Sequence, residues 1–333
     1  MSLFSLAELE AAVPLVRTVV PPTPLYAWPL LAKRAGAEVW VKHENHTPIG
    51  AFKVRGGIVY LDGLKRSGEM LNGVVTATRG NHGQSIALAA ARARVPCAIL
   101  VPYGNSREKN AAMQAFGAEV IVAGADFDES REHAAKLSAE RRYHYVPSFH
   151  ADLVKGVATY ALEMFTAKPD LDAVYAPIGM GSGICGLINV RDLLGLDTEI
   201  IGVVAENAPA IALSFEQGRP VPTNSANTFA DGMACRVPHA EALAIIQGGA
   251  ERIVRVREAE IAGAMRACYE DTHNVAEGAG AAALAALLQE RDRMRGKRVG
   301  LVLSGGNIDR EMLAEVLAGR TPDVSSTSRA EGR

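Results

Sequence analysis

Cysteine is among the rarest residues of this 333-residue chain, which contains four. They stand far apart, at Cys97, Cys185, Cys235 and Cys268, and no two form a CxxC pair. Each lies among apolar or small residues, so we expect buried free thiols rather than disulfides. Free thiols are typical of a reducing compartment, and we expect a cytoplasmic protein.

The chain also lacks an excess of either charge and any long apolar run. Its 35 basic and 37 acidic residues give a net charge of -2, and the basic residues are scattered. Nucleic acid is therefore not an expected partner, whereas a small molecule is. The sequence does not open with a basic segment followed by an apolar one, and no apolar run is long enough to cross a bilayer. Neither a secretory leader nor a membrane association is expected.

Hydrophobic residues make up 48% of the chain and alternate between strand-like and helix-like spacing. Runs rich in β-branched residues predict strands over 73–77, 97–101, 119–123, 173–178, 199–205, 252–256 and 298–303. Apolar residues at helical spacing predict helices over 81–93, 107–116, 126–141, 184–194, 258–272 and 278–290. This alternation is typical of an α/β fold with parallel strands and crossover helices.

The first segment with chemical potential is KHENHTPIGAFKVRGG, residues 42–57, in which Lys53 follows Phe52. A lysine that attacks a carbonyl needs a neutral amine, which burial favours by lowering its pKa. Glycines on both sides of Lys53 would let a planar ring approach the backbone. Taken alone, the segment favours a surface lysine that begins a helix.

The second segment, ATRGNHGQ at residues 77–84, connects a predicted strand to a predicted helix. Backbone N–H groups at a helix N-terminus attract an anion such as a carboxylate or a phosphate. Thr78, Asn81 and His82 add polar groups. A capped turn without a ligand remains the alternative interpretation.

The third segment, PIGMGSGICG at residues 177–186, also leads from a strand into a helix. Its spacing is GxGxGxxG, which differs from the GxGxxG of dinucleotide-binding proteins. A single phosphate cradled by backbone N–H groups fits the pattern better.

The fourth segment, VLSGGNID at residues 302–309, places a serine hydroxyl at the end of a predicted strand. Ligands of open α/β folds bind at the carboxyl ends of parallel strands. A tight turn alone would explain the glycines equally well.

These four segments occur together, and in this order, in one family. From about residue 23 to residue 317 the sequence resembles the serine/threonine dehydratases and serine racemases, which are fold type II enzymes dependent on pyridoxal 5'-phosphate. The resemblance implies that Lys53 binds the cofactor covalently and then acts as the base at the substrate Cα. It implies further cofactor contacts from Phe52 and Gly232 on the ring, Asn81 on the ring hydroxyl, Ser304 at the pyridine nitrogen, and Gly179, Met180, Gly181, Ser182 and Gly183 on the phosphate. The substrate carboxylate is expected on Thr78, Gly80, Asn81 and His82.

The same resemblance implies a two-domain architecture related to the β subunit of tryptophan synthase, each domain being a mostly parallel sheet flanked by helices. Residues 1–72 and 148–319 would form the large, cofactor-binding domain. Residues 73–147 would form a small domain that closes over the substrate. Residues 320–333 are polar and lack periodicity, so we expect a disordered tail with no regulatory domain after it.

A serine opposite the pyridine nitrogen does not force its protonation, so the ring is a weaker electron sink than in enzymes with an acidic partner there. A substrate with a hydroxyl at Cβ then tends to lose it. The expected reaction is elimination of water from a 3-hydroxy amino acid, giving a 2-oxo acid and ammonia. Threonine, serine, phenylserine and 3-hydroxyaspartate all remain candidate substrates.

The sequence departs from the family pattern at Arg79, where racemases of the family place a serine that donates a proton. An arginine is too basic to replace that group, which favours dehydration over racemisation. Arg79 either faces the active site, where it pairs with a second carboxylate or stacks on an aromatic ring, or points outward to a surface acid.

A second departure lies in ENAPAIA, residues 206–212. Relatives bind a divalent cation through an acid like Glu206, a carbonyl like that of Ala210 and an acid two residues further on. This chain has Ala212 at the last position, so a Mg²⁺ site is not expected. A monovalent cation on Glu206 and Ala210, or no cation, is expected instead.

Three functions therefore remain open on the sequence. The first is the dehydratase; the second is an amino-acid racemase or β-replacing synthase of the same fold; the third is a phosphate-binding protein without this cofactor. Members of the family are often dimers, so a homodimer is expected from the resemblance alone.

Overall fold

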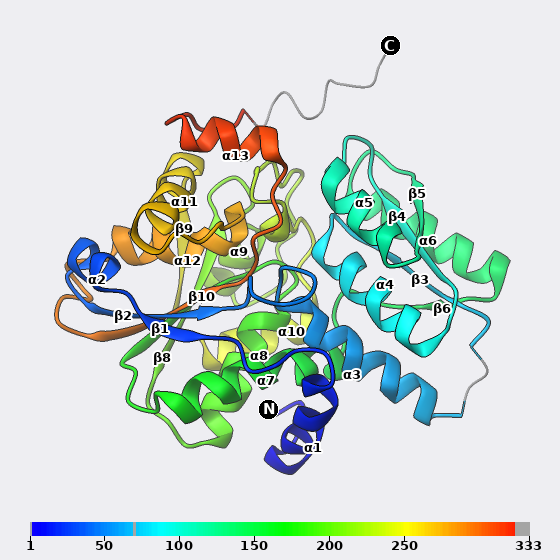
Figure 1. Ribbon diagram of the computed structural model, residues 1–333, viewed down its shortest axis with the longest axis horizontal. Coiled ribbons are helices and arrows are strands. Elements are labelled where there is room, and N and C mark those ends of the chain that lie inside the picture. Colours follow the sequence, from blue (N-terminus) through cyan, green and yellow to red (C-terminus); the bar gives the residue numbers. More distant parts are fainter. Residues whose placement is uncertain (1, 69–70, 324–333) are drawn as a thin grey trace.

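The computed structural model describes residues 2–68 and 71–323 and contains two β-sheets, each flanked by helices (Figure 1). Each sheet and its flanking helices form one body: the first contains the six-stranded sheet and the second the four-stranded sheet. Helix α3 (Lys53–Arg66) packs against α7 (Ala151–Ala167) of the first body and against α4 (Asn81–Ala93) of the second. The two bodies lie side by side in Figure 1, with α3 running between them. Residues 324–333, which make up most of the expected disordered tail, lie outside the described residues.

The first sheet has six strands in the order β1-β2-β10-β7-β8-β9. All neighbours are parallel except β1 and β2, an antiparallel pair that the sequence did not predict. The strands are β1 (Leu25–Ala27), β2 (Glu38–His43), β10 (Arg298–Leu303), β7 (Ala173–Pro177), β8 (Glu199–Ala205) and β9 (Arg252–Val256).

The central strands β10, β7 and β8 are buried on both faces, which explains why they are almost continuously apolar. Successive residues of β7 alternate between two apolar clusters: Tyr175 packs with α12 (Gly278–Gln289), whereas Val174 and Ala176 pack with α7 and α8 (Ser182–Leu193). This alternation follows from the two-residue period of a strand.

The second sheet has four parallel strands in the order β5-β4-β3-β6. They are β5 (Glu119–Val122), β4 (Cys97–Val101), β3 (Val74–Ala77) and β6 (His144–Tyr145). Apolar clusters join this sheet to α4 and α5 (Arg107–Ala115), and to α6 (Phe127–Arg141). All four strands fall within the segment predicted as the small domain; the domain boundaries and the closing movement remain predictions.

The other helices are α1 (Leu6–Arg17), α2 (Pro29–Ala35), α9 (Ala210–Gln217), η1 (Asp231–Met233), α10 (Ala240–Gly249), α11 (Glu258–Thr272) and α13 (Arg310–Leu317). The predicted α/β class, with two mostly parallel sheets flanked by helices, is confirmed. All four cysteines are buried and free, as predicted. No helix in the described ranges has the length and apolarity needed to span a bilayer.

Candidate active site

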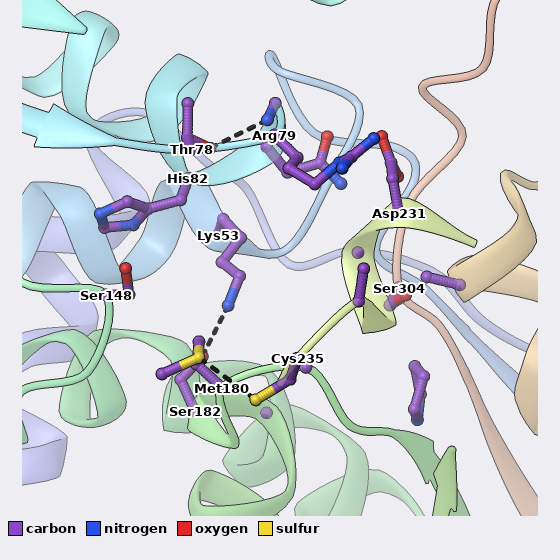
Figure 2. Close-up of a pocket in the computed structure, with 18 of the residues that line it drawn as sticks. Lys53, Thr78, Arg79, His82, Ser148, Met180, Ser182, Asp231, Cys235 and Ser304 are labelled. Atoms are coloured by element: carbon purple, nitrogen blue, oxygen red, sulfur yellow. Dashed lines mark hydrogen bonds between the residues drawn. The ribbon is translucent and has the colours of Figure 1, made fainter. Parts of the chain in front are cut away.

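One cavity collects the residues predicted to bind the cofactor and the substrate (Figure 2). It is lined by Phe52, Lys53, Thr78, Arg79, Gly80, Asn81, His82, Gly179, Met180, Gly181, Ser182, Gly183, Gly232 and Ser304. These residues come from loops that follow the carboxyl ends of β3, β7 and β10, together with the start of α3 and η1. The cavity therefore lies where open α/β folds bind their ligands.

Lys53 is the first residue of α3, and its side chain enters this cavity. Its amine donates a hydrogen bond to Ser182 Oγ at 2.9 Å and lies 4.8 Å from the centroid of the Phe52 ring. Burial lowers the pKa of Lys53 to about 8, although the carboxylate of Glu277 opposes this shift. A larger fraction of the amine is thus neutral near physiological pH, as a nucleophile requires.

A buried ionic network anchors the helix that carries Lys53. Arg55 and Glu44 are both 0% exposed, and Arg55 Nε donates to Glu44 Oε2 at 2.8 Å. Glu163 on α7 accepts from Arg55 Nη1 at 2.9 Å and from Lys42 Nζ at 2.6 Å. Two cations and two carboxylates are thereby matched in the interior. The sequence did not indicate this network, because Glu163 lies 108 residues beyond Arg55 and only the fold brings them together.

The glycine-rich loop between β7 and α8 forms the wall that contains Ser182. Gly181 has φ +99°, a conformation that side chains disfavour, and a Cβ on Gly179 would lie 2.2 Å from the carbonyl oxygen of Gly232. Only glycine permits this close approach. The loop ends at the N-terminus of the 12-residue helix α8, whose free N–H groups attract a phosphate. With the amine of Lys53 beside it, the loop fits pyridoxal phosphate in both charge and shape.

The turn between β3 and α4 is fixed from within. The hydroxyl oxygen of Thr78 accepts hydrogen bonds from the N–H groups of Gly80 at 2.9 Å and Gly83 at 3.2 Å. The amide of Gly80 is therefore engaged inside the turn, and the first free N–H groups of α4 are those of Asn81 and His82. These two amides are therefore the ones that could receive an anion, and a substrate carboxylate on this turn stays a prediction.

His82 Nε2 lies 3.1 Å from Thr76 Oγ1. Burial, together with the nearby charge of Lys53, lowers the pKa of His82 to about 3. The imidazole is therefore neutral at physiological pH.

Three charged residues of the cavity were not predicted: Lys109, Asp231 and Glu277. Lys109 Nζ lies 2.7 Å from Asp231 Oδ2 and 3.0 Å from Glu277 Oε2, and so links α5 to η1 and to the start of α12. Burial opposes the charge on Lys109, but the two carboxylates outweigh it and hold the pKa of Lys109 above its ordinary range. Burial raises the pKa of Glu277, whereas Lys109 lowers it, and the net direction is upward.

Glu277 also orients Asn81. The amide nitrogen of Asn81 donates to Glu277 Oε1 at 2.6 Å, and its oxygen accepts from Asn307 Nδ2 at 2.8 Å. Both ends of this amide are thus fixed. The backbone of Ser304 is also held in place. Its carbonyl oxygen accepts a hydrogen bond from the N–H of Phe52 at 3.1 Å, which connects the residues before Lys53 to the end of β10.

Arg79 lines the cavity, on the Thr78 side in Figure 2. Within residues 2–68 and 71–323 its Nε is buried without a hydrogen-bond partner, and the side chain forms no ion pair. The expected alternative, a salt bridge from Arg79 to a surface acid, is thus not found among the described residues, and a substrate-binding role of Arg79 stays a prediction.

Glu206 and Ala210 lie apart from this cavity. Glu206 is exposed just after β8, and the carbonyl of Ala210 accepts a hydrogen bond from Ser214 Oγ at 2.6 Å. No group of three or more metal-ligating side chains is found in the part of the chain that the structure describes. A monovalent cation at Glu206 and Ala210 stays a prediction.

Comparison with known proteins agrees with this geometry. A family model described as pyridoxal-phosphate dependent enzyme matches residues 16–305. The L-threonine ammonia-lyase of Thermotoga maritima is 33% identical over 316 residues, which cover 95% of this chain and 78% of that protein. The biosynthetic L-threonine dehydratase of Salmonella typhimurium is 33% identical over 290 residues, 86% of this chain but only 56% of the longer relative.

The fold is also shared with solved structures. A pyridoxal 5'-phosphate-dependent aspartate racemase is 29% identical, with a TM-score of 0.86 over 93% of this chain and 97% of that one. The chain therefore belongs to the pyridoxal-phosphate dependent enzymes, within the family of the serine/threonine dehydratases and serine racemases.

Proposed function

We propose that this enzyme is an ammonia-lyase that eliminates water from a 3-hydroxy amino acid, giving a 2-oxo acid and ammonia. The observation that carries the proposal is the amine of Lys53, whose pKa is lowered to about 8 beside a glycine-rich phosphate cradle. The Thermotoga maritima relative carries the same activity in its name.

Pyridoxal phosphate, when bound, supplies an aldehyde for the amine of Lys53 and a ring that stabilises negative charge developing at the substrate Cα. Residues 179–183 and the N-terminus of α8 would hold its phosphate. Phe52 and Gly232 would contact the ring, Asn81 would bond the ring hydroxyl, and Ser304 would lie near the pyridine nitrogen. A serine hydroxyl there would not force protonation of that nitrogen, so the ring would be a moderate electron sink.

The residues of the chain then position the substrate and move its protons. The free N–H groups of Asn81 and His82 receive the substrate carboxylate, and the neutral His82 adds no competing charge. Lys53 removes the proton from Cα, and the hydroxyl at Cβ takes up one proton as it leaves, so that H and OH are lost together as water. Hydrolysis of the resulting product returns one water and releases ammonia, so the net change is from the hydroxy amino acid to the 2-oxo acid and ammonia.

Substrates of this class include threonine, serine, phenylserine and 3-hydroxyaspartate. The test is release of 2-oxo acid from both threo and erythro forms of each, with the holoenzyme. We expect turnover of at least one of them and none with Lys53→Ala. An intact, cofactor-loaded protein that releases no 2-oxo acid from any of them would contradict the proposal.

Racemisation is the second candidate, because one solved relative at 29% identity is an aspartate racemase. A racemase needs an acid on the ring face opposite Lys53, and the racemases of this family use a serine where this chain has Arg79. A guanidinium stays protonated and cannot exchange protons readily. Chiral chromatography of unreacted serine or aspartate after incubation separates the two functions, and no enantiomer is expected to appear.

A further inference from the structure

The cavity wall includes one arginine without an ion pair among the described residues. Arg79 lines the cavity, and its Nε is buried without a hydrogen-bond partner in the described part of the chain. The two carboxylates of the cavity wall, Asp231 and Glu277, are both bound by Lys109 at 2.7 and 3.0 Å, and neither contacts Arg79. The guanidinium is therefore available to an anion from outside the chain.

The backbone next to Arg79 is held in place. Thr78 holds the amides of Gly80 and Gly83, and Gly80 has φ +156°. A Cβ on Gly80 would lie 2.3 Å from Cδ of Lys109, so the turn is packed directly on the Lys109 side chain. The turn that carries Arg79 is thus fixed beside the cavity that Arg79 lines.

The charge and the donors of Arg79 indicate what kind of group it binds. A carboxylate accepts two parallel hydrogen bonds from a guanidinium and neutralises its charge. An aromatic ring stacked on the guanidinium would do neither. An anion is therefore favoured over a ring.

The α-carboxylate of the substrate is not that anion, because the N–H groups of Asn81 and His82 at the start of α4 already form a site for it. We propose that Arg79 binds a second carboxylate, carried on the substrate side chain. This inference rests on the proposed function and deepens it: the preferred substrates are 3-hydroxy amino acids with an acidic side chain, of which 3-hydroxyaspartate is the simplest.

The test compares the holoenzymes of wild type, Arg79→Gln and Arg92→Gln. Arg92 is an exposed arginine at the other end of α4 and serves as the matched control. The specificity constant kcat/KM is measured by release of 2-oxo acid from serine, phenylserine and 3-hydroxyaspartate. We expect Arg79→Gln to lower the ratio of 3-hydroxyaspartate to serine about 10- to 100-fold, the value of a charge-assisted hydrogen bond, and Arg92→Gln to leave it unchanged.

Three results would overturn the inference. Equal losses for serine and 3-hydroxyaspartate would mean that Arg79 holds the α-carboxylate. A selective loss for phenylserine would mean that it stacks on a ring. Unchanged kcat/KM values for all three substrates would mean that it touches no substrate.

Failure of the proposed function looks different, since no substrate would then yield 2-oxo acid. Calorimetric titration of succinate, a dicarboxylate without an amine, into the same holoenzymes still decides the role of Arg79 in that case. We expect binding that weakens in Arg79→Gln and not in Arg92→Gln; equal affinity in all three proteins would contradict the inference.

Discussion

The amine of Lys53 lies 2.9 Å from the hydroxyl oxygen of Ser182, a residue 129 positions further along the chain. Lys53 opens α3 and Ser182 opens α8, so the contact joins the reactive amine to the phosphate cradle. The distance is set by two rigid elements: α3 is anchored by the buried Arg55 network, and the loop before α8 is packed against Gly232. The predictions below test the parts of this arrangement separately.

The lowered pKa of Lys53 predicts the pH dependence of cofactor loading. Only the neutral amine attacks the aldehyde, and the pKa of about 8 means that half of the amine is neutral near that pH. The rate at which the apoenzyme recovers its visible absorbance with added pyridoxal phosphate should therefore rise with pH and level off above about pH 8 to 9. If the rate of recovery still rises tenfold per pH unit up to about pH 10, the pKa of Lys53 is not lowered and the prediction is wrong.

Gly179→Ala should weaken cofactor binding. The added Cβ would lie 2.2 Å from the carbonyl oxygen of Gly232, so the loop must shift. Overpacking of this kind costs about 1–3 kcal/mol, which corresponds to roughly a 5- to 150-fold increase in the dissociation constant for pyridoxal phosphate. Gly248→Ala in α10 is the control, since a Cβ there meets no atom within 4 Å. Equal dissociation constants of the two variants for pyridoxal phosphate would contradict the role of the glycine-rich loop in binding the cofactor.

Loss of Lys109 should destabilise the protein more strongly at higher pH. Burial raises the pKa of Glu277 and Lys109 partly offsets it, so Lys109→Met should raise that pKa further. When the pKa of a carboxyl in the folded protein lies above its ordinary value of 4.5, the free energy of unfolding falls as the pH rises from that ordinary value through the pKa of the folded protein. The deficit in thermal unfolding temperature against wild type should therefore be larger at about pH 8 than at about pH 5.

The control for this comparison is Lys136→Met, which removes an exposed lysine of α6. It should show a small deficit that does not depend on pH. A Lys109→Met deficit that is the same at both pH values would mean that Glu277 does not titrate in this window.

Glu44→Gln should lower the free energy of unfolding by about 3–5 kcal/mol, because it leaves a fully buried Arg55 with one carboxylate fewer. Denaturant titration measures the change. Arg295→Gln breaks an ion pair whose side chains are 77% and 79% exposed, and should change the free energy of unfolding by less than about 1 kcal/mol. Similar values for the two variants would contradict the structural role of the Arg55 network.

Much of the fold could be predicted from the sequence, because a buried parallel strand is a short apolar run that can be recognised without knowledge of its neighbours. The bounds of β4, β8, β9 and β10 were predicted to the residue, since each is a short apolar run between helical patterns. The antiparallel β1 escaped notice because it has only three residues, too few to show a recognisable strand pattern. Strand order was not predictable, since it depends on packing between distant segments.

The site likewise contains residues that the sequence predicted and residues that only the fold brings together. The four glycine-containing segments were recognisable because backbone geometry demands specific residues at specific positions. No sequence pattern distinguished the three charged residues of the cavity, Lys109, Asp231 and Glu277. Each is of a common residue type, and only the fold brings the two carboxylates within 3.0 Å of Lys109 Nζ. The sequence raised the question of Arg79, but its orientation depended on which acids the fold placed nearby.

The covalent role of Lys53 is tested most directly by borohydride reduction of the freshly purified holoenzyme, followed by peptide mapping. The account predicts one modified peptide, which carries the reduced cofactor at Lys53, and no modified peptide from Lys53→Ala. Reduction that labels a different lysine, or none in a protein that is coloured, would contradict it.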